Sequence, residues 1–549
     1  MSKRFLSLAL AVLMCAAIFA GCTSGSTTLS TTSAASATTA AATSGSAATT
    51  NGNDDGFTGY PMTKTDKTLS FYILINYAYA VPDGVDRNDN YFNQKLAEKV
   101  GVKIDWQAVP AGTDAGQAFN LMLASSELPD IYYNAGVPNT AADLLESGTI
   151  ADLSDYLPKY APAYYAKLKS DESIDKSVKT DDGKYYGFAF LRENLYLGTY
   201  AGPVVRQDLL DKVGMTAPVT ISDWDKMLRA FKDQNLAKYP FSVSGGTSSL
   251  SLVFQGAYGS TANFYVDDNQ KIQFGYATDG YKEFLKQMNQ WYKDGIIDPD
   301  MLTNDAAALE TKVLNSEVGA CQSTGGTVIG FDTKLKANNN TTDTWAGVSY
   351  PVLNSGDKVQ FTQGETNNIG LCAVITSSCK DIPLACRFLD YGYTEEGMAL
   401  CSFGEEGVTF EYDSNGVPKY LDSFINDPRG NDFMMKTYTG MSGNCATVHM
   451  LATTNTYPEL RKKAVDSWYV EGTSKHLLPG SLTMTTDESQ SIANEKTAID
   501  TYATEMFAKF VLGQESLDGF DAYLAQLKGM GLEKVQKVYQ DVYDRYLSR

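Results

Sequence analysis

The sequence predicts an α/β protein built from more than one lobe. Three observations indicate this fold class: β-branched and aromatic runs alternate with amphipathic segments of helix length, glycines stand where those helices should stop, and the chain has 549 residues. About 490 of them follow Asp54, which is too many for a single hydrophobic core. Strands that alternate with helices are typical of sheets whose neighbouring strands run parallel.

The beginning of the folded body contains the clearest alternation. The run KTLSFYILINYAY predicts a buried first strand that ends near Asn76. Phe92, Leu96 and Val100 then recur at helical spacing. Gly101 should end that helix. A second strand (VKIDWQAV), a second helix (AGQAFNLMLASSEL) and a third strand (PDIYYNA) follow, an order that predicts a parallel, doubly wound start of the sheet.

The same alternation returns further along the chain. DGKYYGFAFL, NSEVGACQS and NNIGLCAVITSS should be strands. SDWDKMLRAFKDQ should be a helix capped at its start by Ser222. GYKEFLKQMNQWYKDGII, IPLACRFLDYGYTEEGMAL and the C-terminal segment, which is interrupted at GMG, have the apolar periodicity of helices.

Residues 1–21 are predicted to form an export signal. Two basic residues precede a low-charge segment, Phe5–Phe19, of about 15 residues, which is shorter than the roughly 20 that a membrane-spanning helix needs. Small residues then lead into Cys22, an arrangement that resembles the bacterial lipobox, although Phe19 stands where Leu is commoner. The resemblance implies cleavage and lipidation of the Cys22 thiol. The alternatives are an ordinary secretory signal with an incidental cysteine and an uncleaved anchor.

Residues 22–60 are predicted to be a disordered tether. Thr23–Asn53 carries no charged residue and consists almost entirely of Ser, Thr, Ala and Gly. Such a segment cannot bury enough apolar surface to offset its chain entropy. A coil of about 35 residues has a root-mean-square reach of roughly 30–35 Å. Lipid and tether together predict a protein held at the extracellular face of the bacterial cytoplasmic membrane by its lipid anchor only.

Composition argues against several function classes. Loss of the two basic signal residues takes the formal charge from −20 to −22, so nucleic acid is not an expected partner. No cofactor or metal is expected, because the chain has only His449 and His476 and lacks HExxH, GxSxG and Walker motifs. Asp86–Asn90 begins like a calcium loop, but Tyr91 and Ala97 stand where that loop requires Gly and Glu.

Six cysteines lie beyond the predicted lipidation site, and none of them belongs to a CxxC pair. They are Cys321, Cys372, Cys379, Cys386, Cys401 and Cys445. Disulfide bonds and a metal site are two interpretations. Their largely apolar neighbours favour a third, in which the thiols pack in the core as small hydrophobic side chains.

Several segments carry a family resemblance. NQKLAEKVGVKIDWQAVPAG and AFNLMLASSELPDIYY, together with DGKYYGFAF, VVRQDLLDKVGM and WYKDGIIDPD, are similar to segments of bacterial extracellular solute-binding proteins of family 1. FGEEGVTFEYDSNGVPKY and the closing FVLGQESLDGFDAYLAQLKGMGLEKVQKVYQDVYDRYL resemble the long lipoprotein subgroup often called LplA-like. The resemblance implies a two-lobed periplasmic-binding-protein-like (type II) fold, in which each lobe is a mixed β-sheet flanked by helices and hinge crossings join the lobes.

The resemblance also implies how the chain is divided. Residues 61–193 and a return segment, residues 366–440, would form lobe 1. Residues 194–365 and the C-terminal helices within residues 441–549 would form lobe 2. The crossings are expected near Arg192–Tyr196, Glu365–Asn368 and Asp432–Asn444.

Candidate ligand contacts follow from the predicted strand ends, because ligands of open α/β sheets bind beyond the carboxyl ends of strands. Sugars suit aromatic faces and planar polar groups. Trp106 and Trp291 should be core residues by their periodicity, whereas the other three tryptophans lie near helix starts or irregular segments. The candidates, each with a core or surface position as the alternative, are Tyr77, Tyr133, Asn134, Arg192, Asn194, Tyr196, Arg206, Trp224, Gln322, Trp345 and Trp468.

The predicted function is that of a monomeric solute-binding protein without catalytic activity. The family resemblance implies that it captures a carbohydrate, usually an oligosaccharide in this family, and delivers it to the permease subunits of an ABC transporter. Three alternatives remain: a surface glycoside hydrolase or lyase, a binder of peptides or another small solute, and a sensor subunit that reports sugar to a membrane kinase. Carboxylates are plentiful, but nothing singles out a catalytic pair.

Overall fold

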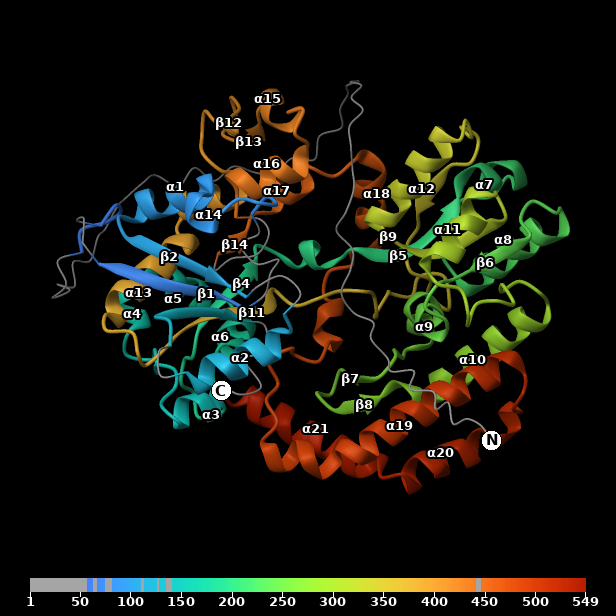
Figure 1. Cartoon of the computed structure of the whole chain (residues 1–549). Helices are drawn as coiled ribbons and strands as arrows, with labels where there is room; N and C mark the ends of the chain where they lie inside the picture. Colours follow the sequence, from blue (N-terminus) through green and yellow to red (C-terminus); the bar gives the residue numbers. More distant parts are fainter. Residues whose placement is uncertain are drawn as a thin grey trace, which may run out of the picture.

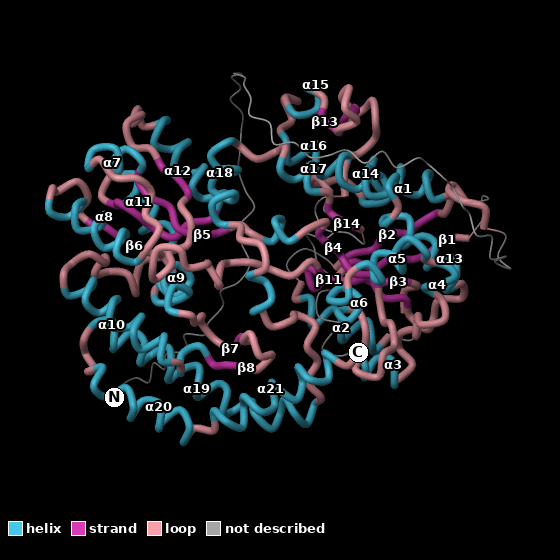
Figure 2. Tube along the Cα trace, turned by 180° about the vertical axis from the view of Figure 1, so that it is seen from behind, coloured by secondary structure: helices cyan, strands magenta, loops and turns pink. Residues whose placement is uncertain are grey.

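The structure, a computed structural model, has two lobes, each built around its own sheet, with the C-terminal helices beneath both in the view of Figure 1. The same arrangement is seen from behind in Figure 2. The predicted two-lobed fold is thereby confirmed. The predicted signal, Cys22 and Tyr77 lie outside the described residues. Those residues are 57–62, 67–74, 81–109, 113–125, 128–134, 141–440 and 446–549.

Lobe 1 contains a six-stranded sheet in the order β14–β4–β11–β3–β1–β2. Its first three strands pair in parallel, as the sequence predicted, whereas β11 runs antiparallel between β3 and β4, so the sheet is mixed. The strands are β1 Thr68–Ile73, β2 Lys103–Ala108, β3 Ile131–Asn134, β4 Phe188–Arg192, β11 Asn368–Ile375 and β14 Thr447–Val448. The helices are α1 Tyr91–Val100, α2 Ala115–Ala124, α3 Ala141–Glu146, α4 Leu157–Tyr160, α5 Pro162–Ser170, α6 Glu172–Ser177, α13 Ile382–Asp390 and α14 Glu395–Phe403.

The core of lobe 1 follows the predicted periodicity. Phe92, Leu96 and Val100 of α1 are buried against β-sheet residues. Gly101 ends α1 with φ 87°, a left-handed conformation that favours glycine. The segment predicted as one helix from residue 382 is instead two helices, because the turn Tyr391–Tyr393 is a 3₁₀ helix with two buried tyrosine rings between α13 and α14.

Lobe 2 contains a four-stranded sheet in the order β10–β5–β9–β6, in which β6 and β9 are parallel and β5 is antiparallel to both of its neighbours. The strands are β5 Ala201–Arg206, β6 Tyr239–Ser242, β9 Val318–Thr324 and β10 Trp345–Gly347, with a separate hairpin of β7 Phe264–Val266 and β8 Ile272–Phe274. The helices are α7 Gln207–Val213, α8 Ile221–Asp233, α9 Thr247–Phe254, α10 Asp279–Lys293, α11 Ala306–Leu314, α12 Gly325–Ala337 and α18 Glu459–Trp468.

The start of α8 differs from its prediction. Thr220, not Ser222, is the N-cap, and its hydroxyl accepts from the Asp223 N–H while the Asp223 carboxylate accepts from the Thr220 N–H. This reciprocal pair is a capping box, which leaves two backbone donors satisfied. The helix therefore begins two residues earlier than a Ser222 cap would place it, at Ile221.

A small subdomain stands on lobe 1 at the top of Figure 1. It consists of the hairpin β12 Phe410–Tyr412 and β13 Pro418–Tyr420 with α15 Asp422–Ile425, α16 Asn431–Tyr438 and α17 Met450–Thr454. β14, between α16 and α17, pairs with β4 of lobe 1. The lobe-1 sheet therefore includes residues 447–448, beyond the boundary expected at residue 440. Further along, the chain passes from α17 to α18 through residues 455–458, whereas the third crossing was expected near Asp432–Asn444.

Three C-terminal helices complete lobe 2: α19 Thr486–Leu512, α20 Phe520–Gly529 and α21 Leu532–Leu547. α19 packs along α10, where the Asn289 side chain donates to the Phe510 and Val511 carbonyls at 2.9 and 3.1 Å. The predicted interruption at GMG is confirmed, because α20 ends at Gly529 and Gly531 has φ 99°.

The C-terminus reaches from lobe 2 to lobe 1, as Figure 1 shows. The guanidinium groups of Arg545 and Arg549 bind the Asp181 carboxylate at 2.9 and 2.6 Å. The Lys176 ammonium donates to the Leu547 carbonyl at 2.6 Å. We call residues 545–549 with these contacts the C-terminal strut.

The N-terminal segment Phe57–Met62 packs on lobe 1. The Tyr60 hydroxyl donates to the Arg387 carbonyl at 2.7 Å, and the Arg387 guanidinium lies 3.8 Å from the centre of the Phe57 ring. The Met62 N–H donates to the Val100 carbonyl at 2.9 Å. Two elements of lobe 1, α13 and α1, therefore hold the beginning of the folded body.

The cysteine thiols that the structure describes are core groups. Cys321, Cys379 and Cys386 are free and buried, and Cys401 is buried in the same lobe-1 core as Cys379 and Cys386. This agrees with the interpretation as small hydrophobic side chains. The Cys372 side chain and Cys445 lie outside the described part. Among the helices that the structure describes, none combines the length and the apolar content that crossing a membrane requires.

Candidate functional site

The lobe-1 side of the candidate site is the edge at which its strands end. β3 ends at Asn134 opposite Cys372 of β11, and Leu191 near the end of β4 lies opposite Asn368 at the start of β11. β14 also pairs with this end of β4. Since β1 and β2 run parallel to β3, their carboxyl ends lie at the same edge. In open α/β sheets this is the edge where ligands bind.

The lobe-2 side is the corresponding edge of the second sheet. β5 begins at Ala201 opposite Thr324, the last residue of β9, and β6 ends at this edge because it is parallel to β9. A glycine pair follows each parallel strand: Gly245–Gly246 precedes α9, and Gly325–Gly326 begins α12. The chain passes from β4 to β5 through one short 3₁₀ helix, Leu195–Gly198 (Figure 1), so the two edges face each other across the crossings.

The first crossing, residues 193–200, is bonded to the second, residues 363–367. The Gln363 side-chain oxygen accepts from the N–H groups of Tyr200 and Ala201 at 2.7 and 3.1 Å, and its nitrogen donates to the Gly198 carbonyl at 3.0 Å. Nearer lobe 1, the Arg192 guanidinium donates to the Thr366 carbonyl at 2.8 Å and pairs with Glu365. One glutamine therefore joins three backbone groups of the neighbouring crossing.

The first crossing is also flanked by segments on either side of the third. Asn194 donates to the Met450 sulfur at 2.9 Å. The Tyr196 hydroxyl donates to the Asp466 carboxylate of α18 at 2.7 Å, and its ring lies 5.4 Å from that of Tyr469. Burial and the bond to Asp466 raise the pKa of Tyr196, so this hydroxyl stays protonated near neutral pH. The first crossing is therefore hydrogen-bonded to the second and to the helices on either side of the third.

Four predicted contacts are buried within the lobes, which is the alternative that the sequence left open for each of them. Tyr133 belongs to the core of lobe 1, and Trp224 and Trp468 are fully buried in lobe 2. Arg206 is 2% exposed and pairs with Asp208 and Asp343. A buried arginine between two carboxylates is a structural group, because its charge is already compensated.

The other predicted contacts are distributed differently. Arg192, Asn194 and Tyr196 lie at the first crossing, as expected, with the partners described above. Gln322 is half-buried on β9, where its oxygen lies 3.4 Å from the Ser249 hydroxyl. Asn134 ends β3, and its side chain lies outside the described part. For all of these, ligand contact stays a prediction. Trp106 and Trp291 are buried, which confirms their assignment to the core.

A comparison with family models matches residues 85–399, more than half of the chain, to the bacterial extracellular solute-binding proteins. The chain belongs to this family. The matched residues run from just before α1 through β11 into α14, so they include most of both sheets.

Two named relatives are similar over long stretches. The fructooligosaccharide ABC transporter substrate-binding protein FusA of Streptococcus pneumoniae serotype 4 is 26% identical over 84% of this chain and 88% of its own length. Lipoprotein LipO of Bacillus subtilis is 24% identical over 56% of this chain and 61% of its own length. Among solved structures, the HMO-binding solute-binding protein of Bifidobacterium longum infantis superposes with a TM-score of 0.68 at 17% identity, over 87% of this chain and 99% of that one, a likeness of fold.

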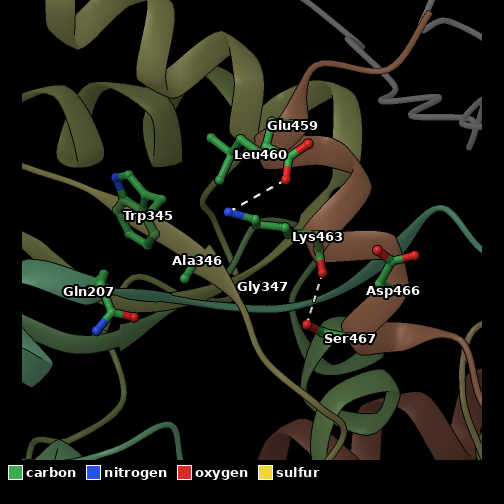
Figure 3. Close-up of a pocket in the computed structure, with 9 residues that line it drawn as sticks. All are labelled: Gln207, Trp345, Ala346, Gly347, Glu459, Leu460, Lys463, Asp466 and Ser467. Atoms are coloured by element: carbon green, nitrogen blue, oxygen red, sulfur yellow. Dashed lines mark hydrogen bonds and ion pairs between the residues drawn. The ribbon is translucent and has the colours of Figure 1, made fainter. Parts of the chain in front are cut away.

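A cavity of about 740 Å³ lies within lobe 2 of this solute-binding protein, between β10 and α18. Figure 3 shows the residues that line it. Trp345, a predicted contact, lines it but is 5% exposed, since its ring packs near Phe331. Lys463 on α18 pairs with Glu459 at 3.5 Å. The lining residues all belong to lobe 2, so this cavity is not formed between the facing edges. A second cavity of about 590 Å³ lies between α8 and α10.

The two histidines have structural contacts. His449 caps α17 by accepting from the Leu451 N–H at 3.1 Å, and His476 contacts the Val266 carbonyl at 2.7 Å. Asp86 and Asn90, from the calcium-like segment, cap a 3₁₀ turn and α1. Within the described ranges, no group of three or more His, Cys, Asp or Glu side chains is placed to hold a metal ion.

Sequence reasoning missed two residues of the facing edge, Tyr200 and Gln363. Tyr200 is 43% exposed and lies between the first crossing and β5. Gln363 lies just before the expected second crossing. Two signals were available in the sequence. Both residues flank a predicted crossing, and both carry side chains that suit hydrogen bonding or stacking.

Proposed function

We propose that this solute-binding protein captures a carbohydrate, in particular an oligosaccharide, between its two lobes and delivers it unchanged to the permease subunits of an ABC importer. The observation that carries the proposal is the similarity to the fructooligosaccharide-binding relative over 84% of this chain. The architecture supports it, because two lobes joined by a narrow bundle of crossings suit hinge closure around a ligand. Polar strand ends on both sides offer groups for sugar hydroxyls.

We further infer that a lipid on Cys22 holds a monomeric body outside the cell through the Ser/Thr/Ala-rich tether. The lipobox-like sequence supports this, as does similarity to a lipoprotein of Bacillus subtilis. Labelling with a fatty acid in the native host should mark the wild-type chain and Cys15→Ser, whose cysteine lies within the signal, but not Cys22→Ser. A label on Cys22→Ser would overturn the assignment.

A thermal-shift screen of the purified body against oligosaccharides tests the main proposal. A ligand present at about 100 times its dissociation constant should stabilise the protein by about 2.7 kcal/mol. Chromatography of the same samples should return the oligosaccharide intact, and small-angle scattering should show a smaller radius of gyration with ligand. Stabilisation by peptides alone, or consumption of the sugar, would overturn the proposal.

A further inference from the structure

The facing edge of lobe 2 presents one large aromatic side chain to solvent. Within the described residues, two aromatic side chains count among the large apolar groups with substantial exposure, Tyr200 at 43% and Tyr412 at 46%. Tyr412 lies on β12 in the small subdomain, whereas Tyr200 lies at the start of β5, where the first crossing enters lobe 2. Tyr200 is therefore the exposed ring at the edge where a ligand between the lobes would lie.

The backbone at Tyr200 is held from both sides. Its N–H donates to Gln363 at 2.7 Å, and its carbonyl accepts from the Gly325 N–H at 2.9 Å. The next residue is fixed as well, because the Ala201 carbonyl accepts from the Tyr350 hydroxyl at 2.7 Å. A main chain bonded at three successive groups leaves the ring little freedom beyond its own side-chain torsions. A ring held in this way loses little entropy when it binds a ligand.

The neighbouring backbone is open on one side only. Gly325 and Gly326 follow the β9 residue that pairs with Ala201. A Cβ at Gly326 would meet only the Thr324 hydroxyl, at 3.9 Å, whereas a Cβ at Gly325 would meet the Arg461 side chain at 2.8 Å. Beyond β9, Leu302 lies beside Gly246, the N-cap of α9 that follows β6, and is 42% exposed.

Resting on the proposed function, we propose that the Tyr200 ring is the stacking platform of lobe 2 for a sugar unit of the bound carbohydrate. The C–H groups of a pyranose or furanose ring form a flat apolar face that packs on an aromatic face, while the phenolic hydroxyl remains at the wet edge. Gly326 leaves the backbone open near the start of β5, and the exposed Leu302 offers a second apolar contact to a longer ligand.

Three variants test the proposal with the oligosaccharide that most stabilises the wild-type protein. By titration calorimetry, Tyr200→Ala should weaken binding about tenfold or more, whereas Tyr200→Phe, which keeps the ring, should stay within about twofold. Tyr412→Ala is the matched control and should bind like wild type. Because Tyr200 is exposed, the melting temperature of unliganded Tyr200→Ala should change little.

The outcomes separate this proposal from the function on which it rests. Equal binding by wild type and Tyr200→Ala overturns the platform and leaves carbohydrate capture standing. Loss of binding in Tyr200→Phe as large as in Tyr200→Ala also overturns it, since the hydroxyl rather than the ring face would then hold the ligand. If the wild-type protein binds no oligosaccharide, both proposals fail.

Discussion

The crossings and the C-terminal strut connect the same two lobes with different chemistry. The crossings are covalent, and the first two are held side by side by neutral hydrogen bonds from Gln363 and, nearer lobe 1, by the Arg192–Glu365 ion pair. The strut is non-covalent and mainly charged: Arg545 and Arg549 bind Asp181, and the Arg545 and Asp181 side chains are 32% and 29% exposed, whereas that of Arg549 is fully buried. The covalent connection cannot separate, whereas the ionic part of the strut weakens if its charges are screened or neutralised.

This difference indicates a division of labour between the two connections. Hinge motions concentrate backbone rotation in a few residues, and the bonded bundle of crossings limits where those residues lie. Charged contacts near the surface contribute little net stability and weaken with salt. We therefore expect the crossings to determine the pivot and the strut to affect how firmly the lobes are held about it.

The largest loss of stability is expected from a substitution where the first and third crossings enter lobe 2. Trp468 of α18 is fully buried, donates from its indole to the Pro203 carbonyl at 3.0 Å and lies directly over Gly202. Trp468→Ala should lower the free energy of unfolding by about 3–5 kcal/mol, measured by urea denaturation, because it opens a cavity in place of the largest side chain at this junction. A loss below about 1 kcal/mol would show that α18 does not fix this end of the crossings.

An intermediate loss of stability is expected when the hydrogen bonds between the first two crossings are removed. Gln363→Ala should cost about 1–3 kcal/mol, since three backbone groups lose their partner. Hydrogen exchange at Tyr200 and Ala201 should accelerate. Gln363→Glu is the matched control: it keeps the acceptor for both N–H groups and loses only the bond to the Gly198 carbonyl, so exchange should remain slow. Equal exchange in both variants would contradict the assignment.

The smallest effect is expected from the strut. Asp181→Asn should cost about 1 kcal/mol or less, and the difference from wild type should shrink in high salt. Asp541→Asn, which breaks a 2.6 Å pair with Lys537 within α21, is the control that leaves the lobes connected. Only Asp181→Asn should increase the spread of interlobe distances measured by scattering. An equal change in both variants would contradict a role between lobes.

The strut should also depend on pH. Burial pushes the pKa of Asp181 upward, but hydrogen bonds from Arg545 and Arg549 outweigh it and lower the pKa below its ordinary value. A lowered pKa contributes stability above the ordinary pKa of about 3.9, and this stability is lost as pH falls through the folded-state value. The difference between wild type and Asp181→Asn should therefore persist at neutral pH and vanish in strong acid.

Much of the fold was predictable from local pattern. The order β1–α1–β2–α2–β3 follows from hydrophobic periodicity and from Gly101, and the break between α20 and α21 from two glycines. α19 was missed because its buried residues, such as Ile492, Ile499 and Phe507, are thinly spread among Thr, Ala and charged residues. β14 has only two residues and is a strand because it pairs with β4. A local sequence pattern cannot predict such a long-range pairing.

The position of the candidate site was predictable from the sequence, but the residues that form it were not. Strand ends and crossings were located, yet Trp224 falls on the buried face of α8 together with Leu228 and Phe231, a helical spacing that was available in the sequence. Arg206 was not predictable in this way, because its partner Asp343 lies far along the chain. The exposure of Tyr200 depends on how β5 pairs with β9 and on Gln363, which only the assembled lobes determine.

The packing of Phe57–Met62 on α13 and α1 has a mechanical consequence. Any load carried by the residues before Phe57 enters the molecule through lobe 1, by way of Tyr60 and Arg387. Lobe 1 is then the fixed lobe, and lobe 2, attached through the crossings and the ionic contacts of the strut, is the lobe that moves. In a protein anchored through its N-terminal segment, lobe 1 would keep its orientation while lobe 2 closes toward it.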